Sequence, residues 1–286
     1  MTNLVHIGPL TFNADPLAGD SLIVENLQGW YSSPAMRVDV EDRPNADGAF
    51  GSVRNYRAAR ALRFSGHLLG ESVVAAQEEL YDAFAAIQAD GVPFQFSVET
   101  DAGTRTTTAT LQGEAEVTPH PDFIGASVVA RFVCYDPIKY GPAQTAQTGL
   151  PDVGGGLEYE LGEPSEALYY GALGDLGRVT LTNSGTAETW PVFEVSGVLD
   201  GGFYLQNLDT GDVLRYDRVV PAGSTVSIDT RTGEVLVDDT SDASTYLTRD
   251  EFFSVPPGGT RTVQFNAIST SSGTPTMTAT YRSGWW

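Results

Sequence analysis

The chain has 286 residues, 41% of them hydrophobic, and this length is typical of two domains with sizeable cores. Its 37 acidic residues outnumber its 16 basic residues and give a formal net charge of -21, which disfavours specific DNA or RNA binding because such a surface repels phosphates. The single cysteine excludes an intramolecular disulfide and a cysteine-rich metal site, and no uninterrupted apolar run reaches membrane-spanning length.

Residues 1–141 are predicted to form a β-rich domain that contains one helix. The helix is expected over about 72–90, because Ser72 can cap its start, Gly91 fits its end, and apolar residues recur between them at three- and four-residue steps. Runs of alternating or β-branched residues predict strands before and after it, at 22–24, 36–40, 61–66, 94–100, 104–111 and 126–135.

A polar stretch from Asp39 to Arg57 separates two of these strands. It holds few residues that could anchor a core, so on the sequence alone it is typical of a mobile surface loop.

The last strand of this domain ends at an Asp-Pro pair. Alternation places Cys134 in an apolar row with Phe132, so we interpret the cysteine as core filling. Pro137 cannot donate a ladder hydrogen bond and biases the preceding residue to extended geometry. We therefore predict a domain boundary here, marked by Asp136, Pro137, Tyr140 and Gly141.

Residues 142–177 are rich in Gly, Pro and small polar residues and are predicted to be a linker or arm. From 178 to 286, short strands follow one another at sandwich-like spacing, with hairpin chemistry at 209–212 and 230–233. Strands without a helix indicate an antiparallel β-sandwich of the jelly-roll kind.

Catalytic and metal-binding patterns are missing from the sequence. His6, His67 and His120 are not at metal-ligand spacing, and no Gly-x-Ser-x-Gly elbow accompanies them. The acidic stretches at 42–48 and 238–242 do not complete a calcium-loop pattern. We therefore expect no catalytic residues, no cofactor and no bound metal.

Exposed aromatic rings leave a second function open, because sugar-binding sandwiches use such rings as stacking platforms. The candidates are Tyr169, Tyr170, Trp285 and Trp286. For the two terminal tryptophans, docking of the last strand onto its own domain is the competing interpretation.

The order of these features resembles that of a distal tail protein, a minor tail protein of long, non-contractile-tailed phages. The similarity rests on F-x-x-x-D-P-x-x-Y-G at 132–141 and on later short motifs: NSGTA at 183–187, VPAGS at 220–224, PPG at 256–258 and YRSGWW at 281–286. The Trp-Trp ending resembles versions from phages of high-GC Gram-positive hosts.

This resemblance implies a mainly β fold, with an N-terminal split-barrel or β-sandwich ring domain followed by a C-terminal galectin-like jelly-roll β-sandwich. It also implies a non-enzymatic virion protein that is assembled in the host cytoplasm. Its homo-oligomeric ring, a hexamer, would sit at the tail tip. The implied partners are the tail tube protein, the tape measure protein, and hub, fibre or baseplate proteins.

Within such a ring, the polar stretch is expected to pack on an adjacent subunit. The candidate interface residues are Asp42, Arg43, Asn45, Phe50, Arg54 and Tyr56. Genomic DNA would pass through the lumen without specific binding, which a negative lumen would favour. A carbohydrate-binding module for host-surface adhesion and a tail-associated hydrolase are the alternatives.

Overall fold

The structure is a computed structural model that describes residues 4–13, 22–38, 40–51, 55–70, 72–89, 91–122, 124–152, 157–158, 169–170 and 176–286. It divides into two compact units. The first contains Met1–Pro142 together with Trp285–Trp286, and the second contains Ala143–Gly284.

The first unit is built on one sheet in the order β11-β12-β8-β3-β2-β1-β9-β10-β13-β27, and a further pairing of β10 with β12 closes part of it into a barrel. Its strands are β1 (Leu4–Ile7), β2 (Leu10–Asn13), β3 (Leu22–Gln28), β8 (Arg60–Leu69), β9 (Phe94–Thr100), β10 (Gly103–Leu111), β11 (Glu116–Pro119), β12 (Gly125–Cys134), β13 (Lys139–Tyr140) and β27 (Gly284–Trp285).

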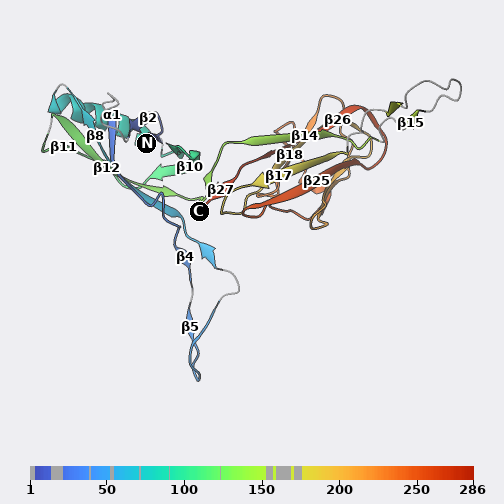
Figure 1. The fold of residues 1–286 in the computed structure, drawn as a ribbon, viewed down its shortest axis with the longest axis horizontal. Coiled ribbons are helices and arrows are strands. Elements are labelled where there is room, and N and C mark those ends of the chain that lie inside the picture. The colour runs from blue at the N-terminus through green and yellow to red at the C-terminus, as the bar shows by residue number, and fades with distance from the viewer. Residues whose placement is uncertain are drawn as a thin grey trace. The chain divides into compact units, whose positions relative to one another are not determined.

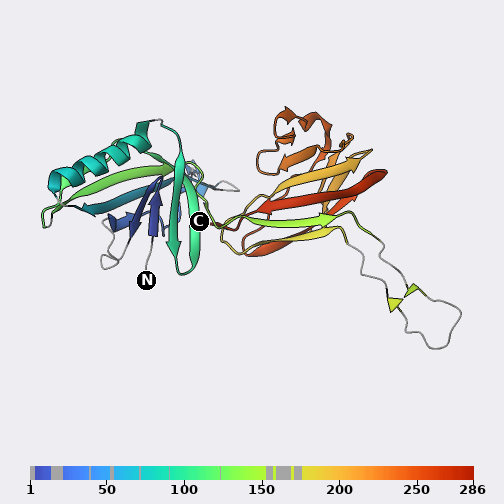
Figure 2. The same ribbon diagram turned by 90° about the horizontal axis from the view of Figure 1, so that it is seen from above.

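The core of this unit follows from strict alternation along its two longest strands. In β8, Leu62 and Phe64 point inward, and in β12 Ala130, Phe132 and Cys134 do the same. Helix α1 (Val73–Ala89) covers one face of this sheet, as Figure 2 shows, and buries Ala76, Leu80 and Phe84 against it. The helix begins where Ser72 Oγ accepts a hydrogen bond from the Ala75 N–H at 3.1 Å.

A long hairpin interrupts the first unit between β3 and β8. Its two short ladders join β4 (Met36–Arg37) to β7 (Tyr56–Arg57) and β5 (Glu41–Asp42) to β6 (Ala49–Phe50). In Figure 1 this segment projects from the sheet of its unit. We call residues 35–58 the projecting hairpin. In its described part, cross-strand pairing therefore gives this polar stretch a hairpin structure, which its sequence pattern did not predict.

The second unit is a sandwich of two antiparallel sheets, with the orders β14-β26-β18-β21-β22-β23 and β17-β25-β19-β20-β24. The strands are β14 (Gln144–Gly149), β17 (Arg178–Asn183), β18 (Val192–Leu199), β19 (Phe203–Asn207), β20 (Val213–Tyr216), β21 (Thr225–Asp229), β22 (Val235–Val237), β23 (Ser241–Asp242), β24 (Leu247–Asp250), β25 (Gly259–Ala267) and β26 (Ser271–Tyr281). A short 3-10 helix lies at Ser244–Tyr246, and β15 (Leu157–Glu158) pairs with β16 (Tyr169–Tyr170) outside the two sheets.

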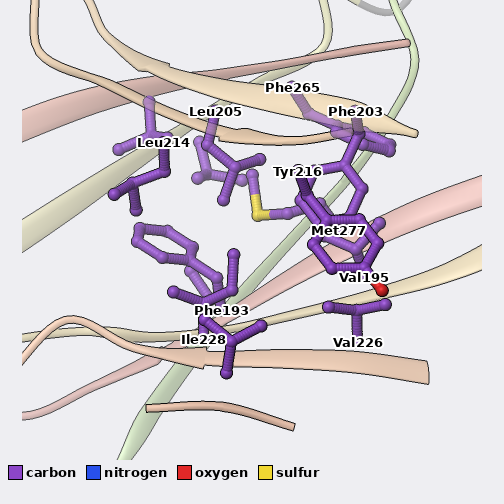
Figure 3. Close-up of a cluster of buried hydrophobic side chains, with 14 of the residues drawn as sticks. Phe193, Val195, Phe203, Leu205, Leu214, Tyr216, Val226, Ile228, Phe265 and Met277 are labelled. Atoms are coloured by element: carbon purple, nitrogen blue, oxygen red, sulfur yellow. The ribbon is translucent and has the colours of Figure 1, made fainter. Parts of the chain in front are cut away.

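Alternating residues from both sheets meet in the core of the sandwich. Figure 3 shows Phe193 and Val195 of one sheet with Phe203 and Phe265 of the other, all of them fully buried. Their burial is the main stabilising contribution to this unit, since each such side chain contributes about 1.5–3 kcal/mol when it leaves water.

The predicted mainly β fold is confirmed, but two segments differ from the predicted domain limits. Gln144–Gly149, placed in the linker, forms β14 and pairs with β26. Its inward residues are Ala146 and Thr148, so the segment lacks the apolar alternation that marks a strand. At the other end, Trp285 and Trp286 belong to the first unit, not to the sandwich.

Candidate functional site

The projecting hairpin exposes large apolar side chains along its length. Their exposed fractions are 46% for Met36, 59% for Val38, 60% for Val40, 55% for Phe50 and 63% for Tyr56. Apolar side chains gathered on one projecting element are typical of a surface that is covered by a partner.

The residues predicted for a subunit interface lie together on this element. Asp42, Asn45 and Tyr56 are exposed, and the Arg43 guanidinium lies 5.5 Å from the centre of the Phe50 ring. Arg54 lies outside the described residues. That these side chains contact another subunit stays a prediction.

The base of the hairpin is held by Arg60, the first residue of β8, which is only 2% exposed. Its Nη1 donates hydrogen bonds to the carbonyl oxygens of Gly29 and Ser32, each at 2.7 Å, where the chain enters the hairpin. Its Nε donates to the carbonyl oxygen of Pro137 at 3.1 Å. Arg60 follows the hairpin directly, so its side chain connects both ends of the hairpin to Pro137, near the end of the first unit.

A second buried cation completes this arrangement, which we call the cationic cluster (Trp30, Arg60 and Lys139). Lys139 Nζ donates to the Trp30 carbonyl oxygen at 2.6 Å and lies 5.4 Å from the centre of the Trp30 ring. Burial, with smaller contributions from the Arg60 and Arg105 guanidinium groups, lowers the pKa of Lys139 to about 8. The cluster therefore holds its charge with carbonyl oxygens and a ring face.

The predicted boundary residues form a fixed turn beside the cluster. The Asp136 carboxylate accepts hydrogen bonds from the Ile138 N–H at 3.1 Å and from the Tyr140 hydroxyl at 2.8 Å. Pro137 contributes the carbonyl that Arg60 binds, and Gly141 is buried directly before the division between the two units. The turn thus orients β13 and brings Lys139 inward.

Sequence reasoning missed the cationic cluster. The available signal was an arginine at an inward position of β8, two residues before Leu62, together with the only lysine of the chain. A charged residue in an apolar row is expected to have a local partner.

The terminal tryptophans lie on arginines of the first unit. The Arg105 guanidinium lies 4.4 Å from the centre of the Trp285 ring, and that of Arg57 lies 4.3 Å from the centre of the Trp286 ring. The interpretation that they dock the last strand onto the sandwich is wrong, because β27 continues the sheet of the first unit after β13.

Sugar stacking stays a prediction for all four aromatic candidates. Tyr169 and Tyr170 are described only as the short strand β16. The second unit has a pocket of about 370 Å³ that is lined partly by Tyr216. Tyr216 is only 1% exposed, so its ring offers no face for stacking. The Arg218 guanidinium lies 4.3 Å from the centre of the neighbouring Tyr246 ring and covers one face of it.

Other reactive groups do not assemble into a site in the described part of the chain. No group of three or more His, Cys, Asp and Glu residues could hold a metal ion there. Burial raises the pKa of the Cys134 thiol to about 11. His67 and His120 do come together, with ring centroids 5.4 Å apart, and burial lowers the pKa of His67.

Among the described residues, no helix combines the length and apolar character needed to span a membrane.

Comparison with known proteins relates this architecture to phage tails. Residues 184–285 match the family model described as siphovirus-type tail component, C-terminal domain. The whole chain is similar to the crystal structure of the Dit protein of phage SPP1, with a TM-score of 0.66 and 13% identity over 100% of both chains. It is also similar to a chain of the phage P2 baseplate in its activated conformation with calcium, with a TM-score of 0.50 and 11% identity over 98% of this chain and 97% of that chain.

No curated protein sequence matches the chain. At 11–13% identity the structural matches establish a shared fold, while the sequence match covers the sandwich except for β14 and β17. The chain is therefore similar to the C-terminal domain of the siphovirus-type tail components over residues 184–285 and has the fold of the SPP1 Dit protein over its whole length, which confirms the resemblance drawn from its motifs.

Proposed function

We propose that this protein is a structural hub of the phage tail tip, where copies of the chain form a ring, a hexamer, that connects the tail tube to baseplate or fibre proteins. The observation that carries this proposal is the projecting hairpin with its exposed apolar side chains. An isolated chain gains nothing from exposing them, whereas a neighbouring copy could bury them.

The structural relatives support the same role. One is described as a paradigm of the hub adsorption apparatus of phages that infect Gram-positive bacteria, and the other is part of a baseplate. We extend these roles to this chain, with the tail tube protein, the tape measure protein and hub or fibre proteins as its partners. Assembly in the cytoplasm of a high-GC Gram-positive host belongs to the same proposal.

The charge of the chain suits a ring through which DNA passes. With a net charge of -21 per copy, an assembled ring would carry a strongly negative potential, and phosphates would move along its lumen without being held. A structural role, without catalysis, is consistent with the chemistry of the described residues.

The mass of the full-length chain in solution tests the ring. Light scattering after size-exclusion chromatography is expected to find six times the mass of the 30.5 kDa chain. The double variant Val40→Ser, Phe50→Ser removes two exposed apolar side chains of the hairpin and should remain folded but weaken assembly about tenfold or more.

A matched control removes two exposed apolar side chains from the second unit, through Leu208→Ser and Val219→Ser. This control should assemble as the unmodified chain does. Equal assembly of the hairpin variant and the unmodified chain would contradict a role for the hairpin, and a chain that stays monomeric even with purified tail tube protein would contradict the ring.

A further inference from the structure

The cationic cluster contains a buried donor group that its own chain does not satisfy. Nη1 and Nε of Arg60 donate to backbone carbonyl oxygens, but the buried Nη2 has no hydrogen-bond partner among the described residues. Leaving a buried donor without an acceptor is costly, and the cost is larger when the donor carries a charge. This nitrogen therefore indicates an acceptor that comes from outside the chain.

The ammonium group of Lys139 lies close to the Arg60 guanidinium. Lys139 Nζ donates at 2.6 Å to the Trp30 carbonyl oxygen, which Arg60 Nη1 also contacts at 3.5 Å. Because both cations bind one oxygen atom, they are close enough to share a second acceptor. An ammonium group has three N–H donors, so Nζ can donate to a further acceptor besides the Trp30 carbonyl.

The charges that act on these two side chains most strongly are positive. The Arg57 guanidinium lowers the pKa of Arg60, and the Arg60 and Arg105 guanidinium groups lower the pKa of Lys139, as like charges do. The Cys134 thiol also acts on Arg60, but its own pKa is about 11, so it is neutral at neutral pH. The cluster is thus a buried region of positive potential.

Carboxylates of the chain do not neutralise this region. No ion pair joins Arg60 or Lys139 to an acidic side chain of the described residues. Asp136 belongs to the adjoining turn, and its carboxylate accepts hydrogen bonds from the Ile138 N–H and the Tyr140 hydroxyl. Two buried positive charges therefore face carbonyl dipoles and a ring, without a counter-ion of their own.

A small anion meets both needs of the cluster. A water molecule could accept from Nη2 but would leave two positive charges in the interior, whereas an anion accepts the same hydrogen bonds and halves the buried charge. We propose that the cationic cluster binds a halide ion, chloride in ordinary media, which accepts hydrogen bonds from Arg60 Nη2 and Lys139 Nζ. Both side chains are only 2% exposed, so an ion that they can enclose suits the site better than phosphate or sulfate.

The bound ion acts on the base of the projecting hairpin. Arg60 holds the carbonyl oxygens of Gly29 and Ser32 there, so an anion that fixes its guanidinium also fixes these two contacts. The stability of the first unit therefore depends on the halide concentration. This inference concerns one copy of the chain and does not depend on the proposed ring.

Thermal unfolding of the full-length chain in two sodium salts tests the site. At pH 7.5 and constant ionic strength, replacing gluconate by chloride should raise the Tm of the first unit by about 3 °C or more, along a saturation curve. At pH 10.5 the rise should be smaller, because Lys139, with its pKa of about 8, is then neutral and attracts the anion less.

Lys139→Met should remove most of the chloride effect at pH 7.5. Arg218→Met is the matched control, since it removes an exposed cation that lies on an aromatic ring of the second unit, and it should keep the full effect. An equal chloride effect in the Lys139 variant and the unmodified chain would overturn the site.

Crystals of the unmodified chain soaked in sodium bromide provide a direct measurement that needs no variant. Bromide should give an anomalous difference peak within hydrogen-bond distance of Arg60 Nη2 and Lys139 Nζ. A water molecule at this position without anomalous signal would overturn the proposal. A bromide peak without any chloride dependence of stability would show binding at crystal concentration only and would overturn it as well.

Discussion

At the scale of single residues, the cationic cluster places two positive charges in the interior of the first unit. Arg60 and Lys139 are each 2% exposed, and both donate hydrogen bonds to backbone carbonyl oxygens. Burying a charge is costly, and charge-assisted hydrogen bonds together with the Trp30 ring face offset this cost. The cluster therefore fixes the geometry of the hairpin base more than it adds net stability.

The pKa of Lys139 predicts how stability depends on pH. Its pKa is about 8 in the folded chain and 10.5 ordinarily, so between these values the unfolded chain binds more protons, and stability rises with pH. Deprotonation of Lys139 should raise the free energy of unfolding by about 3 kcal/mol between pH 8 and pH 10.5, and it contributes no such increase below pH 8. Urea denaturation followed by tryptophan fluorescence at pH 7.5, 9 and 10.5 measures it.

Lys139→Met provides the comparison, because it keeps the side-chain volume and removes the titrating group. The difference in unfolding free energy between this variant and the unmodified chain should change by about 3 kcal/mol between pH 7.5 and pH 10.5. Parallel pH profiles for the two chains would show that Lys139 does not titrate in this range.

Cys134 is expected to be inert and replaceable. Its side chain is fully buried and its thiol pKa is about 11, so almost no thiolate exists at neutral pH. Cys134→Ala should cost about 1 kcal/mol of stability, through a small cavity, and leave assembly unchanged. A thiol reagent should react with the unmodified protein only in denaturant, and rapid reaction of the native chain would contradict this assignment.

At the scale of elements, the hairpin depends on a close backbone approach at its base. Gly29 has a φ of +88°, and a Cβ at this position would lie 2.1 Å from the carbonyl oxygen of Ala61. Only glycine both adopts this left-handed conformation readily and lacks the Cβ that would collide with the Ala61 carbonyl oxygen. Because Arg60 binds the Gly29 carbonyl, displacement here would also disturb the cationic cluster.

Gly29→Ala is therefore expected to destabilise the first unit by about 3 kcal/mol or more. Gly48→Ala is the matched control, since Gly48 has a φ of +89° but nothing lies within 4 Å of the added Cβ. The control should cost about 1 kcal/mol, from backbone strain alone. If the two substitutions lowered the melting temperature equally, the close approach of Gly29 to the Ala61 carbonyl would not contribute to the stability of the first unit.

At the scale of the whole molecule, the chain enters the second unit after Pro142 and returns to the first unit at Trp285. The sandwich is thus inserted between β13 and β27, two strands that are neighbours in one sheet. The final tryptophans supply side-chain contacts to the first unit although they follow the last strand of the sandwich in sequence.

Trp285→Ala combined with Trp286→Ala should reduce the stability of the first unit and leave that of the second unchanged. The two rings lie on Arg105 and Arg57 of the first unit, and their loss removes buried area and two cation–π contacts. Hydrogen exchange should accelerate in β10 and β13 but not in β18 and β21. Faster exchange in the sandwich strands would contradict the division of the chain.

Local patterns predicted much of the architecture. Alternation in β12 predicted both its span and the inward position of Cys134, and Ser72 and Gly91 bounded the helix within about one residue. The cluster at the hairpin base was beyond sequence reasoning, since Arg60 lies 31 residues from Gly29 and 77 from Pro137 along the chain. The alternation of β8 marks Arg60 as an inward residue, but no local pattern identifies partners that lie so far away along the chain.

The sequence by itself determined the mainly β class, the single predicted helix, the acidic surface and the resemblance to phage tail proteins, because these follow from composition, periodicity and motif order. Only the tertiary structure decided where charges are buried and which unit the last two residues join. These features depend on contacts between residues far apart in the chain, and register and packing, not local propensity, set such contacts.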